Sequence, residues 1–275
     1  MTSAIRLGLG LSVLAMAFGS AACGGSDATA SGGTGPIIVG GSGGSSSSTG
    51  GTSSGGTSSG GAGTSEGVPL TPTMGWVDGM SNTLGIQGAY FAYADPTTLP
   101  SVMSDVMSSP KVCMKGTAAK VDLTCTPMAP ATDCYGTFWG AAIGLNLNQP
   151  NVTDPTTMMM KGGDPVPFDA SAIKGFAFDI EAGADGTSTI PLPAQFRFNI
   201  EDATTQYCTP NAKGVKPGHN SYLFTDVMSK CYATPPGPSA TTIQMGVVKI
   251  SWQVVTVAAS TTPFDFCISN VVALQ

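Results

Sequence analysis

Charged side chains are scarce in this 275-residue chain, at 10% of all residues, and acidic ones outnumber basic ones by 17 to 11. No run of lysine or arginine occurs, and no stretch has the pattern of a basic amphipathic helix. Proteins that bind DNA or RNA through the phosphate backbone need clustered cations. We therefore exclude nucleic acid as a partner.

Histidine is also almost absent. A Ser–His or Cys–His mechanism would have to use His219, the only histidine, which stands in the loop-like stretch KPGHNSY. The chain has no Cys-x-x-Cys and no Cys/His cluster, so we expect no structural zinc site. HExxH, Walker and dinucleotide-binding patterns are missing. The one G-x-S-x-G match, at 40–44, lies in low-complexity sequence.

The first 23 residues have the pattern of an export signal. Arg6 precedes an apolar run over 7–18, which is too short to span a bilayer, and small residues then lead to Cys23. This layout resembles a bacterial lipoprotein signal, although Ser20 stands where that family usually has leucine. The resemblance implies that residues 1–23 are a signal peptide ending at an acylated Cys23. It also implies anchoring in the cell envelope, at the outer membrane because Gly24 follows. An ordinary secretory signal, giving an extracellular protein, is the alternative.

A Gly/Ser/Thr-rich segment follows, over 24–67. Residues 40–65 contain only glycine, serine and threonine apart from Ala62. Such sequence cannot bury enough apolar surface to offset its ordering entropy, so we expect a disordered linker. A coil of this length has an r.m.s. reach of about 35–40 Å, which suits a tether between a membrane and a folded module.

Cysteine usage supports export. Seven cysteines are present, and an acylated Cys23 would leave six, an even number that suits three disulfides in an oxidising compartment. Sequence alone leaves their pairing open. The six candidates are Cys113, Cys125, Cys134, Cys208, Cys231 and Cys267.

Alternating apolar residues dominate 68–275, which is long enough for one sizeable domain. Turn-forming residues separate the alternating runs. Only 99–107 has helical spacing. Many strands and little helix predict an all-β sandwich. The expected strands lie at 88–93, 138–148, 173–180, 194–200, 248–256 and 264–274.

The order of these runs resembles the jelly-roll sandwich of galactose-binding-like domains, a group that includes many carbohydrate-binding modules. The resemblance is carried by 169–176, where an aspartate precedes a hydrophobic-x-Gly-aromatic pattern, by the strand 194–200, and by 264–271. It covers about 75–275. It implies a jelly roll and a non-catalytic carbohydrate-binding function, with a polysaccharide or surface glycan as the partner.

Strand parity defines a candidate ligand surface. If the aromatic residues of each run face the core, amide, guanidinium and carboxylate side chains face outward, and such groups match sugar hydroxyls. An ordinary solvated face explains the same pattern. Trp139 and Trp252 fall on core parity, which leaves Trp76 and then Tyr135 as stacking platforms. The outward polar residues are Asn146, Asn148, Asp179, Gln195, Arg197, Asn199 and Gln253.

Two further hypotheses concern carboxylates. A structural calcium ion, the one cofactor we consider, would take oxygen ligands from Asp78, Asn82, Asp95 and Asp265, although these also suit turns. A glycoside hydrolase needs two carboxylates at a set separation, and the glutamates of the domain are Glu181 and Glu201, with Asp179 and Asp265 as partners. Hydrolysis, and a structural or protein-adhesion role, are the alternatives to glycan binding.

Overall fold

We describe a computed structural model of the chain. It describes residues 67–95, 97–101, 111–122, 134–156, 158, 160–183, 192–193 and 195–275, which belong to one compact unit. The expected signal peptide, Cys23, Cys125 and all but the last residue of the expected linker lie outside these residues. No helix among them is long and apolar enough to cross a membrane.

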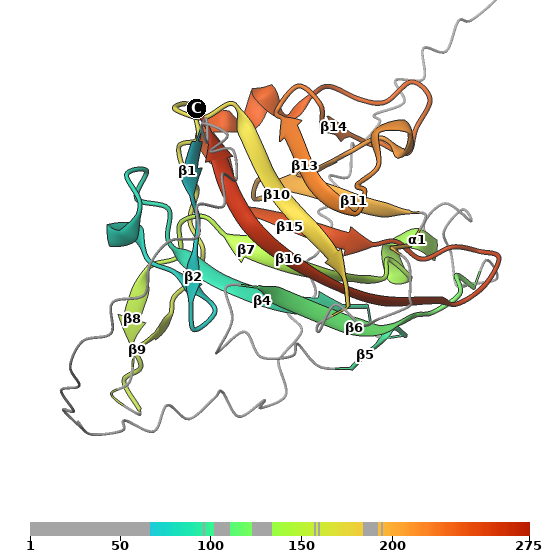
Figure 1. Ribbon diagram of the computed structural model, residues 1–275, viewed down its shortest axis with the longest axis horizontal. Helices are drawn as coiled ribbons and strands as arrows, with labels where there is room; N and C mark the ends of the chain where they lie inside the picture. Colours follow the sequence, from blue (N-terminus) through green and yellow to red (C-terminus); the bar gives the residue numbers. More distant parts are fainter. Residues whose placement is uncertain are drawn as a thin grey trace, which may run out of the picture. The chain divides into compact units, whose positions relative to one another are not determined.

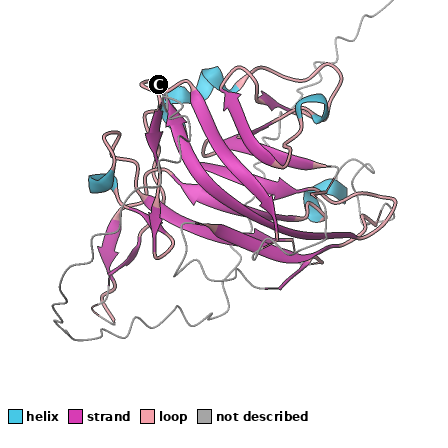
Figure 2. Ribbon diagram, in the orientation of Figure 1, coloured by secondary structure: helices cyan, strands magenta, loops and turns pink. Residues whose placement is uncertain are grey.

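Two antiparallel sheets make up most of the described chain (Figures 1 and 2). The first has the order β13 (Gly218–Leu223), β10 (Gly175–Ala182), β16 (Thr262–Leu274), β6 (Val112–Ala118) and β5 (Leu99–Ser101), with β1 (Gly67–Pro69) also on β16. The second has the order β14 (Met228–Ser229), β12 (Gln206–Cys208), β11 (Phe196–Glu201), β15 (Lys249–Val254), β7 (Ala141–Asn146), β4 (Gly88–Ala94), β3 (Trp76–Val77) and β2 (Pro72–Thr73).

The remaining elements are short. Within the described part of the chain, one separate hairpin pairs two strands, and one α-helix and several 3-10 turns lie in the connections. Their bounds are β8 (Asn151–Thr153), β9 (Met160–Gly162), α1 (Cys134–Thr137), η1 (Gly79–Ser81), η3 (Asn211–Lys213) and η4 (Ala240–Gly246).

Eight of the strands follow a jelly-roll path. Along the chain they are β6, β7, β10, β11, β12, β13, β15 and β16, and the first pairs with the last, the second with the next to last, and so inward to β11 with β12. Such pairing rolls one long antiparallel ribbon into two facing sheets. The predicted all-β jelly-roll sandwich is therefore confirmed by the strand order itself.

Aromatic side chains from both sheets fill the core. Phe178 of β10 contacts Phe198 of β11 and Trp252 of β15, with ring centroids 5.0 and 5.3 Å apart. All three are fully buried. They lie on the parity that the sequence predicts, because a half-buried strand places alternate side chains on the same face. This parity fixes which side chains remain for the outer faces.

Disulfide bonds crosslink parts of each sheet. Cys113 of β6 is bonded to Cys267 of β16, and Cys208 of β12 to Cys231. Cys134 is also disulfide-bonded. The predicted use of these five cysteines in disulfides is therefore confirmed. The pairings show that one bond joins neighbouring strands of the first sheet and the other fixes the segment after β12.

Two local predictions are wrong. Leu99–Ser101 form strand β5 rather than the start of a helix, because Leu99 pairs with Thr117 on the edge of the first sheet. Pro100 is tolerated there since an edge strand does not need every N–H. The rest of the expected helix lies outside the described residues. His219, expected in a loop, is in β13 opposite Asp179.

Candidate functional site

The outer face of the second sheet, the face turned away from the sandwich core, carries three rows of side chains set by strand register. Each row crosses the sheet through directly paired residues. The rows are Asn146, Lys249, Glu201 and Gln206; then Phe91, Gly144, Ser251, Asn199 and Cys208; then Tyr93, Ala142, Gln253 and Arg197. Trp76 pairs with Ala89 at the β3 edge of the same sheet.

Three aromatic rings form a cap over the middle of this face. Phe91 and Tyr93 of β4 lie 5.3 Å apart, and Tyr93 lies 5.2 Å from Trp139. The Phe91 ring covers Gly144 of the neighbouring strand so closely that a Cβ there would lie 2.6 Å from its Cζ atom. The ring can lean over β7 because Gly144 has no side chain. We call Phe91, Tyr93 and Trp139 the aromatic cap.

A buried polar network lies beside the cap. Asn199 Nδ2 donates to Ser251 Oγ at 3.1 Å and to Gln253 Oε1 at 3.2 Å. Ser251 Oγ donates to Glu201 Oε1 at 3.0 Å, and Gln253 Nε2 donates to the Trp139 carbonyl at 2.9 Å. Asn199 and Ser251 are fully buried, although the sequence predicted a solvated or ligand-facing row at Asn199. The network fixes the side chains beneath the candidate ligand surface.

Lys249 links the network to the cap. Its Nζ lies 3.1 Å from Glu201 Oε2 and 4.7 Å from the centre of the Tyr93 ring. Burial first, and then the negative charge of Glu201, raise the pKa of Tyr93 far above its ordinary value of 10.0. Its hydroxyl therefore stays protonated and able to donate a hydrogen bond at any physiological pH.

A cavity of about 610 Å³ opens at the Glu201 end of the face. Gln149 is fixed in its wall: the side-chain carbonyl accepts from Ala89 N at 3.0 Å and from Asn146 Nδ2 at 3.1 Å. The cavity thus offers one aromatic ring, two amides, several carboxylates and one ammonium group. Those lining side chains are Phe91, Asn146, Gln149, Asp164, Glu201, Asp202 and Lys249.

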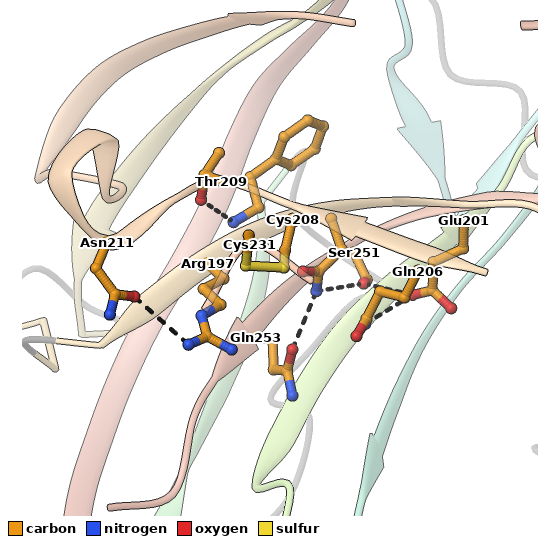
Figure 3. The surroundings of a disulfide bond; sticks show 11 residues. Arg197, Glu201, Gln206, Cys208, Thr209, Asn211, Cys231, Ser251 and Gln253 are labelled. Atoms are coloured by element: carbon orange, nitrogen blue, oxygen red, sulfur yellow. Dashed lines mark hydrogen bonds between the residues drawn. A yellow bond between two sulfur atoms is a disulfide. The ribbon is translucent and has the colours of Figure 1, made fainter. Parts of the chain in front are cut away.

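Arg197 occupies the other end of the face. Its guanidinium lies 5.9 Å from the centre of the Tyr232 ring, and one terminal nitrogen donates to Asn211 Oδ1 at 3.4 Å. Figure 3 shows it beside Asn211 and the Gln253 side chain, below the Cys208–Cys231 disulfide. That bond anchors Tyr232 through its neighbour in the chain. Burial lowers the pKa of Arg197, and Tyr232 opposes that shift.

The structure brings four of the predicted glycan-binding residues together: Asn146, Arg197, Asn199 and Gln253 share this face. Trp76 lies at its edge, where its ring packs on Gly162.

The other predicted residues lie elsewhere. Asp179 lies on the first sheet, where it accepts hydrogen bonds from Asn270 at 2.7 Å and contacts His219 at 2.8 Å. Asn148 donates to the Pro167 carbonyl at 3.1 Å from beyond the end of β7. Gln195 immediately precedes β11 and is half-buried, and Tyr135 lies in α1, its side chain outside the described part.

Sequence reasoning missed the aromatic cap. Trp139 was expected in the core, but it is half-buried and stacks on the outer face. The reason is Gly140, whose φ of 100° interrupts the alternation just before β7. Phe91 and Tyr93 were visible in the run GAYFAY as aromatics on the parity opposite to Tyr90. Aromatic residues on both faces of this strand were the signal that some of them lie on the outer face.

The candidate calcium ligands do not form one site. Asp78, Asp95 and Asp265 are not clustered, and no group of three or more His, Cys, Asp or Glu converges within the described part of the chain. Asn82 bonds to Ile86 and caps the turn with Asp78. Asp95 accepts from Thr97, from Thr98 and from the Gly140 N–H. The side-chain and backbone oxygens of these two segments accept hydrogen bonds that stabilise local turns of the chain.

No family model and no curated protein matches this chain. Among solved structures it is similar to the family 11 carbohydrate-binding module of the cellulosomal cellulase Lic26A-Cel5E of Clostridium thermocellum. The identity is 11%, the match covers 68% of this chain and 87% of that one, and the TM-score is 0.38.

Two further structures are similar at the same level. The family 11 module of Clostridium thermocellum in complex with a beta-1,3-1,4-mixed-linked tetrasaccharide gives 10% identity, 68% and 88% coverage and a TM-score of 0.35. PfGH50B gives 11% identity, 68% and 22% coverage and a TM-score of 0.34. Likeness this distant assigns no function, so the outer face has to be judged by its own chemistry.

Proposed function

We propose that this domain is a non-catalytic module that binds a polysaccharide on the outer face of the second sheet. One observation carries the proposal: a cavity of about 610 Å³ joins the Phe91 ring to the amides of Asn146 and Gln149 and to the Lys249–Glu201 pair. Sugar rings present an apolar face for an aromatic ring and hydroxyls for amides and charged groups. Phe91, Asn146, Lys249 and Glu201 stand on strands, and Gln149 follows β7 and is held by hydrogen bonds from Ala89 and Asn146.

The carboxylates favour binding over hydrolysis. Glu201 is held by Lys249 at 3.1 Å, by Ser251 at 3.0 Å and by Gln206 at 3.4 Å. Both of its carboxylate oxygens are therefore already engaged by neighbouring side chains of the same sheet. The other glutamate, Glu181, pairs with Lys111 on the first sheet. The two glutamates therefore cannot act as one pair.

Retention on polysaccharides tests the proposal. A Cys23→Ser chain, which cannot be acylated, would be mixed with insoluble polysaccharides and cell-wall preparations, and the supernatant analysed for released sugars. We expect retention without release, and about tenfold weaker binding for Phe91→Ala, taking as a guide the stacking of a nucleobase on an aromatic ring, which is worth of the order of 1–3 kcal/mol. Leu223→Ala, which truncates an exposed apolar side chain on the first sheet, is the matched control.

Three outcomes contradict the proposal. Released oligosaccharides would replace binding by hydrolysis. If Phe91→Ala bound as tightly as the wild type, the cavity would not be part of the binding site. No retention on any matrix would favour a structural or protein-adhesion role.

We also propose that Cys23 anchors the protein in the cell envelope, at the outer membrane. The support is the lipoprotein-like layout of residues 1–23 and the glycine- and serine-rich segment after it. Expression in a bacterium fed labelled palmitate should label the wild-type chain and leave Cys23→Ser unlabelled and soluble. An unlabelled wild-type chain in the culture medium would support the ordinary secretory signal instead.

A further inference from the structure

Arg197 is a cation without an acidic partner. Within the described residues no carboxylate forms a salt bridge with its guanidinium, although Lys249 of the same sheet and Lys213 of η3 both have one. Its Nε is buried and has no hydrogen-bond partner, and the hydrogen bond that a terminal nitrogen donates to Asn211 is long at 3.4 Å. Most of the five donors of this guanidinium are therefore unused.

A partly buried charge without a counter-ion is unfavourable. Removing it from water costs free energy that only an opposite charge or strong hydrogen bonds repay. Among the described residues the surroundings of Arg197 supply neither, because Gln253 opposite it and Asn211 beside it are neutral amides. The planar fork of a guanidinium matches a carboxylate in a bidentate geometry, which a lysine cannot offer. The site is therefore complementary to a carboxylate that none of the described residues supplies.

Tyr232 adds a stacking surface to the same place. Its side chain is 68% exposed, its ring centre lies 5.9 Å from the guanidinium, and the neighbouring Cys231 is fixed to β12 by a disulfide. The Tyr232 ring can stack on the apolar face of a sugar, and the Arg197 guanidinium beside it can bind an acid group of the same sugar. The combination is that expected for an acidic sugar.

The two ends of the face differ in charge. Arg197 and Glu201 are four residues apart on β11, which places their Cα atoms about 13 Å apart. The cavity at the Glu201 end is lined by the carboxylates of Asp164 and Asp202 as well as Glu201. An acid group is repelled there and attracted at Arg197, so an extended ligand fits best with a neutral sugar in the cavity.

We propose that the ligand is an acidic polysaccharide in which uronic acids alternate with neutral sugars, and that Arg197 binds the carboxylate of one uronic acid beside Tyr232. This inference rests on the proposed function, since it specifies the ligand of the same face. The net charge of the chain is −6, which disfavours unspecific adsorption of polyanions. Binding of an acidic polymer would therefore report on a specific site.

Affinity electrophoresis with matched polymers tests the inference. The Cys23→Ser chain would be run against hyaluronan and glucuronoxylan, against the same polymers after reduction of their carboxyl groups, and against a sulfated neutral galactan. We expect binding to hyaluronan, in which uronic acids alternate with neutral sugars, at least tenfold weaker binding to its reduced form, and weaker binding to glucuronoxylan, whose uronic acids are only side branches. Arg197→Gln should weaken binding to the uronate polymer roughly tenfold to a hundredfold, and Arg197→Lys should fall between.

Two controls separate recognition from folding and from net charge. Lys120→Gln removes the same charge from an exposed position after β6 and should leave all affinities unchanged. Thermal unfolding checks that Arg197→Gln is folded. Tyr232→Ala is the second variant, because it alters an exposed ring without changing a strand, and it should also weaken uronate binding.

The possible failures are distinguishable. Equal binding of the reduced and unreduced polymers, with Arg197→Gln unchanged, would overturn the acidic-ligand inference and leave the proposed function standing. Equally tight binding of the sulfated galactan would overturn the assignment of a carboxylate. Absence of binding to every neutral and acidic polymer would overturn both.

Discussion

The packing of Phe91 over Gly144 can be tested by a double-mutant cycle. A Cβ at position 144 would lie 2.6 Å from Phe91 Cζ and 2.9 Å from Cε1. Carbon atoms in good contact are about 3.5–4.0 Å apart, so Gly144→Ala forces the ring to move by about 1 Å. Overpacking of this kind destabilises by about 1–3 kcal/mol. The aromatic cap, and the cavity wall that Phe91 forms, would shift with the ring.

The same substitution has an opposite effect on the backbone. Alanine restricts the unfolded chain more than glycine, which stabilises by about 0.4–1 kcal/mol where the native conformation is compatible. Gly144 is not among the glycines with positive φ, so this gain applies. We expect Gly144→Ala to destabilise the wild type by about 1 kcal/mol and to stabilise a Phe91→Ala background by about 0.5 kcal/mol.

Urea unfolding of the wild type, both single variants and the double variant measures the coupling. The m-values should agree, so that differences in midpoint report stability alone. Independent sites are additive within about 0.5 kcal/mol. A coupling free energy below that limit would falsify the placement of the Phe91 ring over β7, and with it the cavity wall on which the proposed function rests.

Two further predictions concern stability. Cys113 and Cys267 are 154 residues apart, whereas Cys208 and Cys231 are 23 residues apart. Removing the first disulfide should therefore destabilise the protein more than removing the second, because the loop-closure entropy of the unfolded chain corresponds to about 5 kcal/mol for the first and about 3.4 kcal/mol for the second. Equal losses of stability in urea unfolding would contradict this model. Burial first, and then the charge of Asp226, raise the pKa of Tyr222 to about 12. The neutral Tyr222 hydroxyl therefore contributes its full share of the free energy of unfolding below pH 10 and loses it as pH rises through 12. The difference in stability between the wild type and Tyr222→Phe should shrink over that range. A difference in stability that stays constant would contradict the raised pKa.

The sequence predicted the core better than the surface. Phe178, Phe198 and Trp252 are buried as their alternation indicates, because apolar side chains on one face of a strand have to leave water together. The parity also placed Arg197 and Gln253 on an outer face. It could not show that they are directly opposite each other, since that depends on β11 pairing with β15 across more than 50 residues of chain.

The failures have equally local reasons. Trp139 lies outside the core because Gly140, with a positive φ, interrupts the alternation of side chains. The side chains before Gly140 therefore point to the opposite face from the one that the pattern predicts. Leu99–Ser101 became a strand because β6 offered an edge to pair with, and such tertiary pairing overrides a short helical pattern. Asp179 has the outward parity expected of it, but β10 belongs to the other sheet.

The sequence by itself determined the fold class, the separation of a low-complexity segment from an alternating domain, and which cysteines were available for disulfides. These depend on composition and on spacing between near neighbours, which the chain displays directly. Only the tertiary structure decided that Phe91 leans over Gly144, and that Arg197 stands beside Tyr232 with no carboxylate partner among the described residues. Each of those contacts joins segments that are distant in sequence, so it exists only once the ribbon has rolled and the register of its strands is set.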